Sequence, residues 1–342
     1  MWHGILGHDD VVEQFRRTLA SGRLASTYLF VGPPGVGKRR FSIELAHSLL
    51  CTVNNEAALE PCGKCESCRM FAAGNHPDLE LIGLPPDKAT LPIDLFIGDR
   101  DHRNQEGLCH RISMRPFFGR RKVAIIDDAD HFGIPSANCL LKTLEEPPPS
   151  AMLILIGTSP SRQLPTIRSR SQVVRFRGLD VNTVANILIG SGVVADRELA
   201  MRAAELSEGS VERARQLADP ALWSFRDQLS SALAVSPIDS VRLARAVQTF
   251  VDEAGKESSQ RRGRLRVVIG FAVESYRSRL RIDQPHEADT QALEACLAAL
   301  EQIDRNANLG LVIQDWCEEL SGFSARISGQ NRLSAASNVT HV

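Results

Sequence analysis

Four of the eight cysteines in this 342-residue chain lie close together in the sequence, namely Cys51, Cys62, Cys65 and Cys68. Two residues between thiolates allow both sulfurs to bind the same ion, and four thiolates complete a closed tetrahedral Zn²⁺ site. A closed shell leaves no position for water, so we expect a structural zinc module over residues 51–76. A redox-active Cys-x-x-Cys is the alternative interpretation, but that chemistry does not use a third and a fourth cysteine.

A glycine-rich loop precedes the cysteines. Its sequence, GPPGVGK, fits the phosphate-binding pattern G-x-x-x-x-G-K, and it lies between a predicted strand and a predicted helix, as the motif requires. Backbone N–H groups of such a loop bind phosphate oxygens, and the lysine adds a full positive charge at the N-terminus of the helix. We expect a nucleotide site at Gly32, Gly35, Gly37 and Lys38. The other interpretation is a relic loop that holds only the fold.

Two features bear on hydrolysis at this site. The residue after the lysine is normally Ser or Thr, whose hydroxyl holds Mg²⁺, but here it is Arg39, and a guanidinium has no lone pair for a cation. An apolar strand ends in Asp127 and Asp128, the Walker B arrangement, in which the first carboxylate supports Mg²⁺ and the second polarises the attacking water. Asp128 is one methylene shorter than the glutamate that is usual there. We expect a weakened site without efficient hydrolysis, or else two acids that merely solvate a strand end.

Short apolar strands alternate with helices in the first half of the chain, which predicts a mostly parallel sheet covered by helices on both faces. The expected strands are residues 28–31, 122–126, 152–156 and 172–176. Residues 85–107 carry many charges without periodicity and are predicted to form a surface loop. After about Gly178 the patterns are helical. The expected divisions are an α/β domain 1–178, a helical lid 179–220, an all-α domain 221–328 and a disordered tail 329–342.

The composition is that of a globular protein, with 43% hydrophobic and 24% charged residues and a formal net charge of −1. This balance excludes the strongly basic footprint of a free-standing nucleic-acid binder. One basic run, Lys256 to Arg266, is interpreted as a solvated helix face in preference to a DNA contact. The N-terminus does not read as a secretory signal and no apolar run is long enough to cross a bilayer, so we expect a cytoplasmic protein without a membrane partner.

Several motifs follow one another in a recognisable order. They are Ile5-Leu6-Gly7, the phosphate loop, the cysteine insertion, Arg115-Pro116, Gly119-Arg120-Arg121-Lys122 before the acidic strand, LLKTLEEPP at 140–148, and Arg168-Ser169-Arg170-Ser171. In this order they resemble the AAA+ clamp-loader family, and within it the delta-prime subunits of bacterial DNA polymerase III. The match covers residues 1–220 well and is looser over the C-terminal helices. The LLKTLEEPP stretch is quite specific to clamp loaders, whereas the phosphate loop alone is not.

The resemblance implies an architecture and a role. The fold class is α/β, with an AAA+ P-loop domain that carries the zinc module as an insertion, a small helical lid and a C-terminal all-α collar domain. The role is that of a rigid stator in a hetero-pentamer with gamma/tau-like ATPase subunits and a delta subunit, which opens a sliding clamp and places it on primed DNA during replication. Through this assembly the chain would be part of the DNA polymerase III holoenzyme, without ATPase activity of its own. Whether ATP or ADP is bound without hydrolysis stays open.

The resemblance also assigns residues. Delta-prime subunits lend the arginine of a Ser-Arg-Cys motif to the ATP of a neighbour, and here Arg170 keeps that arginine while Ser171 replaces the cysteine. Thr158 lies at the end of a predicted strand, where AAA+ proteins place a polar sensor. Active relatives carry a second sensor arginine where Glu212 lies. Arg213 is one residue later, displaced by about 100° around a helix, and whether it compensates is left open.

Two other functions stay open on the sequence. An ATP-hydrolysing, gamma/tau-like motor subunit would require Mg²⁺ to be held without a hydroxyl at residue 39. A zinc-binding adaptor would use an inactive AAA+ fold only for protein contacts, and replacing Arg170 would then leave the ATPase rate of the loader unchanged.

Overall fold

The computed structural model describes residues 2–86, 88–118, 120–281 and 287–337, with side chains as far as residue 326. The chain forms two compact units, one that ends at Ala214 and one that begins at Arg215. The first unit contains a sheet, the helices that cover it and two further helices, and the described part of the second consists of helices and their connections. Among the described residues, no helix combines the length and the apolar character needed to cross a membrane.

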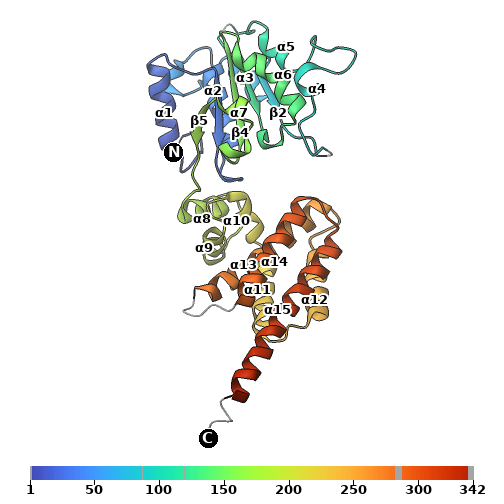
Figure 1. The fold of residues 1–342 in the computed structure, drawn as a ribbon. Coiled ribbons are helices and arrows are strands. Elements are labelled where there is room, and N and C mark those ends of the chain that lie inside the picture. The colour runs from blue at the N-terminus through green and yellow to red at the C-terminus, as the bar shows by residue number, and fades with distance from the viewer. Residues whose placement is uncertain (1, 87, 119, 282–286, 338–342) are drawn as a thin grey trace. The chain divides into compact units, whose positions relative to one another are not determined.

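Five parallel strands form one sheet in the order β2-β3-β4-β1-β5 (Figure 1). Their bounds are β1 Thr27–Val31, β2 Leu79–Ile82, β3 Lys122–Ile126, β4 Ala151–Gly157 and β5 Gln172–Arg175. The predicted parallel α/β fold is confirmed, and four strands lie where the sequence predicts them. The sequence pattern does not predict β2, because this short edge strand buries only Ile82 and carries a charged residue, Glu80.

The central strands are buried on both faces, so their alternate side chains enter two separate cores. Tyr28 and Phe30 of β1 enter the first core, and Leu29 and Val31 enter the second. Helices cover both faces, as Figure 1 shows. The first core is covered by α1 Asp9–Ala20 and α2 Lys38–Leu50, and the second by α4 Asp94–Ile97, α5 Leu108–Ser113, α6 Ile134–Glu145 and α7 Pro165–Arg168.

Aromatic rings fill the first core. Phe15 of α1 lies 5.0 Å from Tyr28, between ring centroids, and Phe41 of α2 lies 5.9 Å from Phe30 and 5.1 Å from Phe176. Tilted and edge-to-face pairs at these distances are favourable beyond the area that they bury. The helix that follows the phosphate loop is therefore held firmly against the sheet.

The segment 85–107 is only partly the predicted surface loop. It contains α4, and Leu91 and Phe96 are almost fully buried in the second core. Two isolated apolar anchors have no period, so the sequence pattern does not reveal them. The charged residues lie mainly between Gly98 and Gly107, where the chain closes on itself: a Cβ on Gly107 would lie 2.5 Å from the backbone nitrogen of Gly98.

Helices and their connections make up the rest of the described chain. In order they are α8 Val181–Gly190, α9 Arg197–Leu206, α10 Val211–Leu217, α11 Pro220–Ala234, α12 Ser240–Asp252, α13 Ser258–Leu280, α14 Glu287–Asp304 and α15 Leu309–Ser337. The expected lid, 179–220, crosses the boundary between the two compact units, so the division into three domains stays a prediction. The backbone is helical as far as Ser337, and residues 338–342 lie outside the described residues, so the disordered tail expected over 329–342 stays a prediction.

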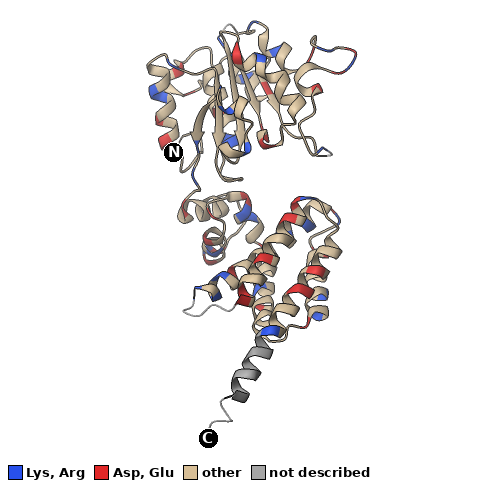
Figure 2. Ribbon diagram, viewed as in Figure 1, with Lys and Arg blue, Asp and Glu red and all other residues tan. Residues whose placement is uncertain are grey.

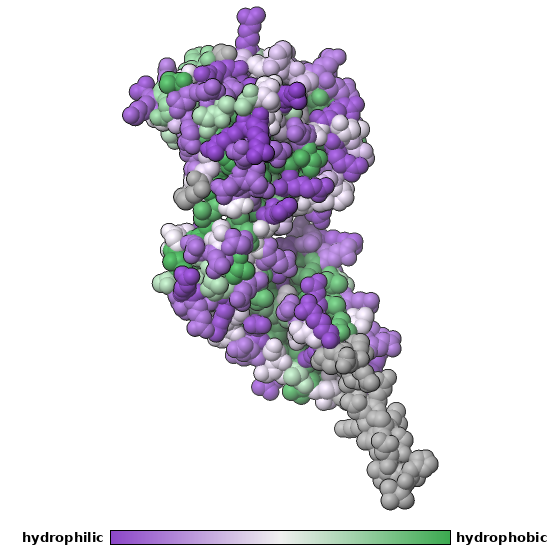
Figure 3. Space-filling view, turned by 90° about the vertical axis from the view of Figure 1, so that its left-hand side faces the viewer, coloured by the Kyte–Doolittle hydropathy of each residue, from purple (hydrophilic) through white to green (hydrophobic). Residues whose placement is uncertain are grey.

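Charged side chains of both signs are interspersed along these helices (Figure 2), and the face drawn in Figure 3 is mostly hydrophilic. The arginines of the basic run in α13 have partners inside the second unit. Arg264 lies 2.6 Å from Asp219, and Arg266 pairs with Asp304. Arg262 donates to the backbone carbonyls of Ile303, Asn306 and Ala307, at and just beyond the end of α14. These cations therefore serve internal contacts of the helical unit.

Candidate functional site

The four cysteine sulfurs converge. They all lie within 4.8 Å of one another, and the Sγ atoms of Cys62 and Cys68 are 3.9 Å apart. Cys51 ends α2, and Cys65 is the N-cap of α3 (Glu66–Ala72). Tetrahedral zinc with Zn–S bonds of about 2.3 Å requires S···S separations of about 3.8 Å. The predicted cluster is therefore present, it can hold a metal ion, and its all-sulfur donor set suits zinc.

Backbone N–H groups support the sulfurs. The N–H of Cys65 points to Sγ of Cys62 at 3.3 Å, and the N–H of Cys68 points to Sγ of Cys65 at 3.4 Å. Burial raises the pKa of the Cys65 thiol, but hydrogen bonds from Thr52 and from Cys68 outweigh burial and lower this pKa to about 6. The thiolate is the form that binds metal. The thiolate is thus favoured at Cys65, whereas burial and the neighbouring thiol of Cys65 raise the pKa of Cys68.

Arg120 ties the start of this module to the sheet. Its guanidinium donates to the carbonyls of Cys51 at 2.6 Å, Asn54 at 2.9 Å and Thr52 at 3.0 Å. Arg121, the next residue, makes a two-pronged ion pair with Glu56. Both arginines directly precede β3, so the strand that ends in the acidic pair is linked to the cysteine module.

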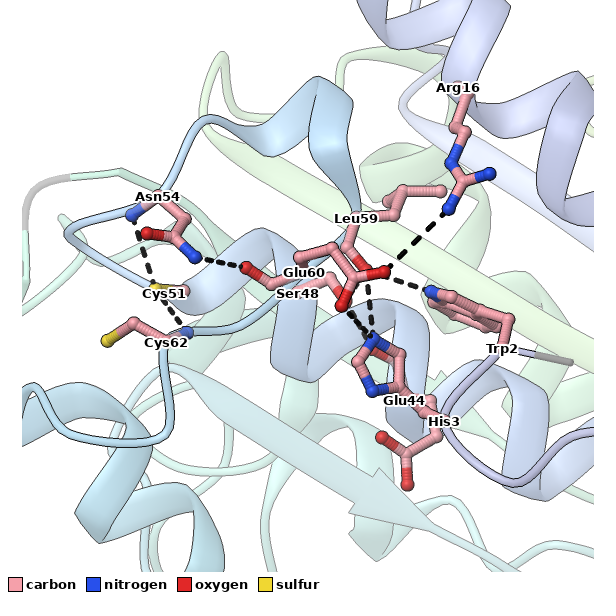
Figure 4. A network of polar contacts seen from close by, with 10 residues as sticks. All are labelled: Trp2, His3, Arg16, Glu44, Ser48, Cys51, Asn54, Leu59, Glu60 and Cys62. Carbon is pink, nitrogen blue, oxygen red and sulfur yellow. Dashed lines mark hydrogen bonds and ion pairs between the residues drawn. The ribbon is translucent and has the colours of Figure 1, made fainter.

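The N-terminal segment also contacts the spacer between Cys51 and Cys62 (Figure 4). The backbone carbonyl of Leu59 accepts hydrogen bonds from Nε1 of Trp2 at 2.8 Å and from the hydroxyl of Ser48 at 3.1 Å, and the ring of His3 lies 3.1 Å away. Leu59 is fully buried and has a positive φ of 53°. The spacer is therefore an ordered part of the α/β unit.

The phosphate loop has the backbone that the motif requires. Gly32, Gly35 and Gly37 have φ values of 155°, 70° and 101°, and α2 begins at Lys38. A Cβ on Gly32 would lie 2.2 Å from the carbonyl oxygen of Phe176, so only glycine fits there. Nζ of Lys38 donates to the carbonyls of Gly32 and Pro33, each at 2.7 Å, and burial lowers its pKa. The lysine thus folds back on its own loop.

Arg39 contacts the first residue of the acidic pair. Its Nε lies 3.5 Å from Oδ2 of Asp127, the carboxylate that supports Mg²⁺ in an active site. Burial raises the pKa of Asp127, and Arg39 and Lys38 oppose that effect. A cation of the protein itself therefore neutralises Asp127. The residues present do not fit Mg²⁺, because the hydroxyl ligand is missing and an arginine pairs with the carboxylate.

The other polar groups expected at this site also have internal partners. Asp128 has a positive φ of 54°, and its Oδ2 accepts the backbone N–H of Leu84 at 3.1 Å. The hydroxyl and the backbone N–H of Thr158 both donate to Oδ2 of Asp130, at 2.5 Å and 2.8 Å. Gln163 donates to the other oxygen of the same carboxylate. The sequence pattern does not identify Asp130 and Gln163, because nothing in the chain order links them to Thr158.

Glu212 lies against the phosphate loop. The backbone N–H of Val211 donates to the carbonyl of Gly35 at 3.0 Å, and a Cβ on Gly35 would lie 2.7 Å from Cβ of Glu212. Oγ of Ser210 would lie nearer still, at 2.5 Å, so a hydroxyl and the stem of an acidic side chain flank the loop at Gly35. A carboxylate near the loop repels phosphate. Arg213 is engaged elsewhere, since its Nη1 lies 3.2 Å from Glu208. This arrangement argues against Arg213 as a replacement for a sensor arginine.

Arg170 pairs with a carboxylate from another helix and also contacts its own turn. Its Nη2 lies 2.7 Å from Oε1 of Glu145, the last residue of α6, and its side chain is 34% exposed. Its Nη1 donates to the carbonyl of Thr166 at 3.0 Å and to the hydroxyl of Ser169 at 3.2 Å. The guanidinium is thus ordered and partly open to solvent.

The first half of the chain matches a known family. Residues 7–180, about half of the chain, match the model of the family described as DNA polymerase III, delta subunit. The chain belongs to this family. The resemblance to clamp loaders drawn from the motif order is confirmed, and so is the resemblance to delta-prime subunits, because the named relatives include two of them.

Three relatives align with parts of this chain. The delta-prime subunit of Pseudomonas aeruginosa is 40% identical over 146 residues, which is 43% of this chain and 41% of that protein. The delta-prime subunit of Bacillus subtilis is 34% identical over 186 residues, 54% of this chain and 51% of that protein. The tau subunit of Escherichia coli is 29% identical over 260 residues, 74% of this chain and 38% of that protein. The chain thus spans about half or less of the length of these relatives.

One solved structure extends over most of the chain. A gamma subunit-related protein of Thermotoga maritima aligns with a TM-score of 0.45 at 16% identity, covering 92% of this chain and 99% of that chain.

Proposed function

We propose that this chain is a delta-prime-like clamp-loader subunit that does not hydrolyse ATP and that supplies Arg170 to the nucleotide of a neighbouring ATPase subunit. In this role it assembles with gamma/tau-like and delta subunits in a hetero-pentamer, which opens the sliding clamp and places it on primed DNA. The delta-prime relatives support this assembly. Clamp and DNA would be engaged through the whole assembly.

The observation that carries the proposal is the contact between Arg39 and Asp127. Metal-assisted phosphoryl transfer needs the Walker B carboxylate free to hold Mg²⁺. In this chain a guanidinium pairs with that carboxylate, and the side chain that lies at Gly35 of the loop where relatives carry a sensor arginine is the acidic Glu212. Binding of ATP or ADP without hydrolysis stays a prediction for Gly32, Gly35, Gly37 and Lys38.

Arg170 has the properties that a donated arginine needs. It is permanently charged, and its planar fork suits a transferring phosphoryl group. It is held by ordered neighbours yet partly exposed, with Nε unpaired among the described residues. Support for the trans role comes from this exposure together with the delta-prime motif order.

We further propose that the cysteine cluster binds one structural zinc ion. When bound, the ion would join the end of α2 to the start of α3 through Cys51 and Cys65. Arg120 and the Leu59 carbonyl would hold the same segment against the sheet. A closed four-thiolate shell offers no open position for catalysis, so the role of the ion is to order the insertion.

ATP turnover tests the proposal. The purified chain is measured alone and then mixed with the cognate ATPase and delta subunits, the clamp and primed DNA. We expect no turnover from the chain alone, and a rate in the mixture that falls by about 10³-fold with Arg170→Ala at the sites that receive this arginine. Arg168→Ala is the matched control, because Arg168 is exposed and makes no ion pair among the described residues.

The alternative function is that of a gamma/tau-like motor subunit. One observation favours this alternative, since the tau relative matches 74% of this chain. This reading predicts Mg²⁺-dependent turnover by the chain alone. The adaptor reading instead predicts that Arg170→Ala leaves the rate of the mixture unchanged.

A further inference from the structure

We propose that Glu145 is a positioning residue for Arg170, so that the carboxylate at the end of α6 sets the orientation in which the arginine meets the nucleotide of a neighbour. This inference rests on the proposed trans role of Arg170. It concerns a residue that touches neither nucleotide nor metal and that the motif pattern alone does not assign.

The backbone beneath Arg170 is fixed first. Ile167 of α7 is fully buried in the second core, in a cluster with Leu140 and Leu144 of α6. Just after α7 the chain turns, and the hydroxyls of Ser169 and Ser171 donate to carbonyls of α7 at 3.1 Å and 2.8 Å. These bonds satisfy carbonyls that a helix end leaves without partners. The serines on either side of Arg170 therefore hold its Cα in place relative to α6.

The guanidinium is fixed second. Nη1 donates to the carbonyl of Thr166 and the hydroxyl of Ser169, and Nη2 lies 2.7 Å from Glu145. The first two contacts come from the same turn, so they move with it. Only Glu145 belongs to another element. Without that carboxylate, nothing among the described contacts of Arg170 defines the direction of Nη2, and the long side chain regains rotamer freedom.

Glu145 lies at a helix end that attracts a cation such as Arg170. It ends α6, where carbonyl groups without intrahelical partners give the helix a negative pole. The carboxylate is itself 49% exposed, so the ion pair is screened by solvent and contributes little to stability. A merely structural pair of this kind would leave the assembled loader unaffected. An orienting pair acts through geometry, to which phosphoryl transfer is sensitive.

Arg170 keeps a donor for an acceptor outside the chain. Its Nε has no hydrogen-bond partner among the described residues, and 34% of its side chain is exposed to solvent. An acceptor from outside the chain, such as a γ-phosphate oxygen, meets an N–H group whose plane is already set by three contacts. A prepared geometry of this kind raises turnover more than it raises affinity for the nucleotide.

The test is Glu145→Ala in the reconstituted loader, measured as steady-state ATP turnover with clamp and primed DNA. We expect kcat to fall about five- to tenfold while KM for ATP changes less than about twofold, because the residue orients a group that acts in the transition state. Glu145→Asp should restore part of the rate. Glu146→Ala is the matched control, since Glu146 is exposed and has no ion pair within the described part of the chain.

A double mutant separates this inference from the proposed function. In the Arg170→Ala background, Glu145→Ala should not lower the turnover rate further, because the guanidinium that Glu145 orients is absent. An unchanged or increased rate with Glu145→Ala alone would overturn the positioning role while Arg170 retained its own. An additional loss in the Arg170→Ala background would also overturn it. If Arg170→Ala itself has no effect, it is the proposed function that is wrong.

Discussion

Replacing Arg120 by alanine should weaken the cysteine module and the α/β unit together. The guanidinium makes three hydrogen bonds, to the carbonyls of Cys51, Thr52 and Asn54, at 2.6 to 3.0 Å. Hydrogen bonds from a charged donor contribute about 1.5–3 kcal/mol each, and the freed carbonyls of a half-buried loop regain water. We therefore expect the free energy of unfolding to fall by about 2–4 kcal/mol, less than the sum of the three.

Thermal unfolding followed by circular dichroism measures this change. For a unit of this size, 1 kcal/mol corresponds to about 2–4 °C, so Tm should fall by about 4–16 °C. Arg121→Ala is the matched control, because it removes the partly buried, two-pronged ion pair with Glu56 while the carbonyls of Cys51, Thr52 and Asn54 keep their donor. A chelator should also extract bound zinc faster from Arg120→Ala than from Arg121→Ala. A loss of stability no larger than that of the control, with unchanged zinc release, would refute the anchoring role.

Three further predictions follow from other contacts. Zinc should bind at one equivalent per chain, and Cys65→Ala should abolish this stoichiometry in elemental analysis while the helices of the second unit still form. Burial lowers the pKa of His76 below its ordinary 6.5, so the neutral ring is the stable form in the fold. The stability that the neutral ring contributes is fully present above about pH 6.5 and is lost as the pH falls through the lowered pKa of the folded state. Denaturant titrations between pH 7.5 and 5 should show that loss, and His76→Asn should flatten it. Arg262→Ala removes three long hydrogen bonds at the end of α14 and should cost about 1 kcal/mol, with no change in DNA affinity of the assembled loader.

The pH prediction has a defined geometry. Nδ1 of His76 accepts the backbone N–H of Asp78 at 3.1 Å, and its Nε2 lies 2.9 Å from the hydroxyl of Ser67, which donates to Leu50. The neutral tautomer with the proton on Nε2 satisfies this chain of bonds. A second proton on Nδ1 would face the N–H of Asp78, so protonation and folding oppose each other.

The sequence predicts the elements whose signal is local. An unbroken apolar run identifies a strand that is buried on both faces, and Gly32 to Lys38 indicates a phosphate loop because few sequences satisfy that backbone. The four cysteines predict their own convergence, since ligand spacing is a property of the chain. The sequence pattern does not predict β2, because an edge strand with one buried residue has almost no periodicity. The burial of Phe96 in α4 is not predicted for a similar reason.

What only the tertiary structure decided is which groups meet. Arg39 and Asp127 lie on different elements, and so do Arg170 and Glu145; their sequence positions identify each residue but not its partner. The same holds for Arg120, which reaches carbonyls almost seventy residues away. Local pattern records the conformation that each segment prefers, whereas an ion pair depends on how the sheet brings two segments together. The sequence by itself thus determined the family and the candidate residues, and the packing determined that Arg39, beside the phosphate-loop motif, pairs with Asp127.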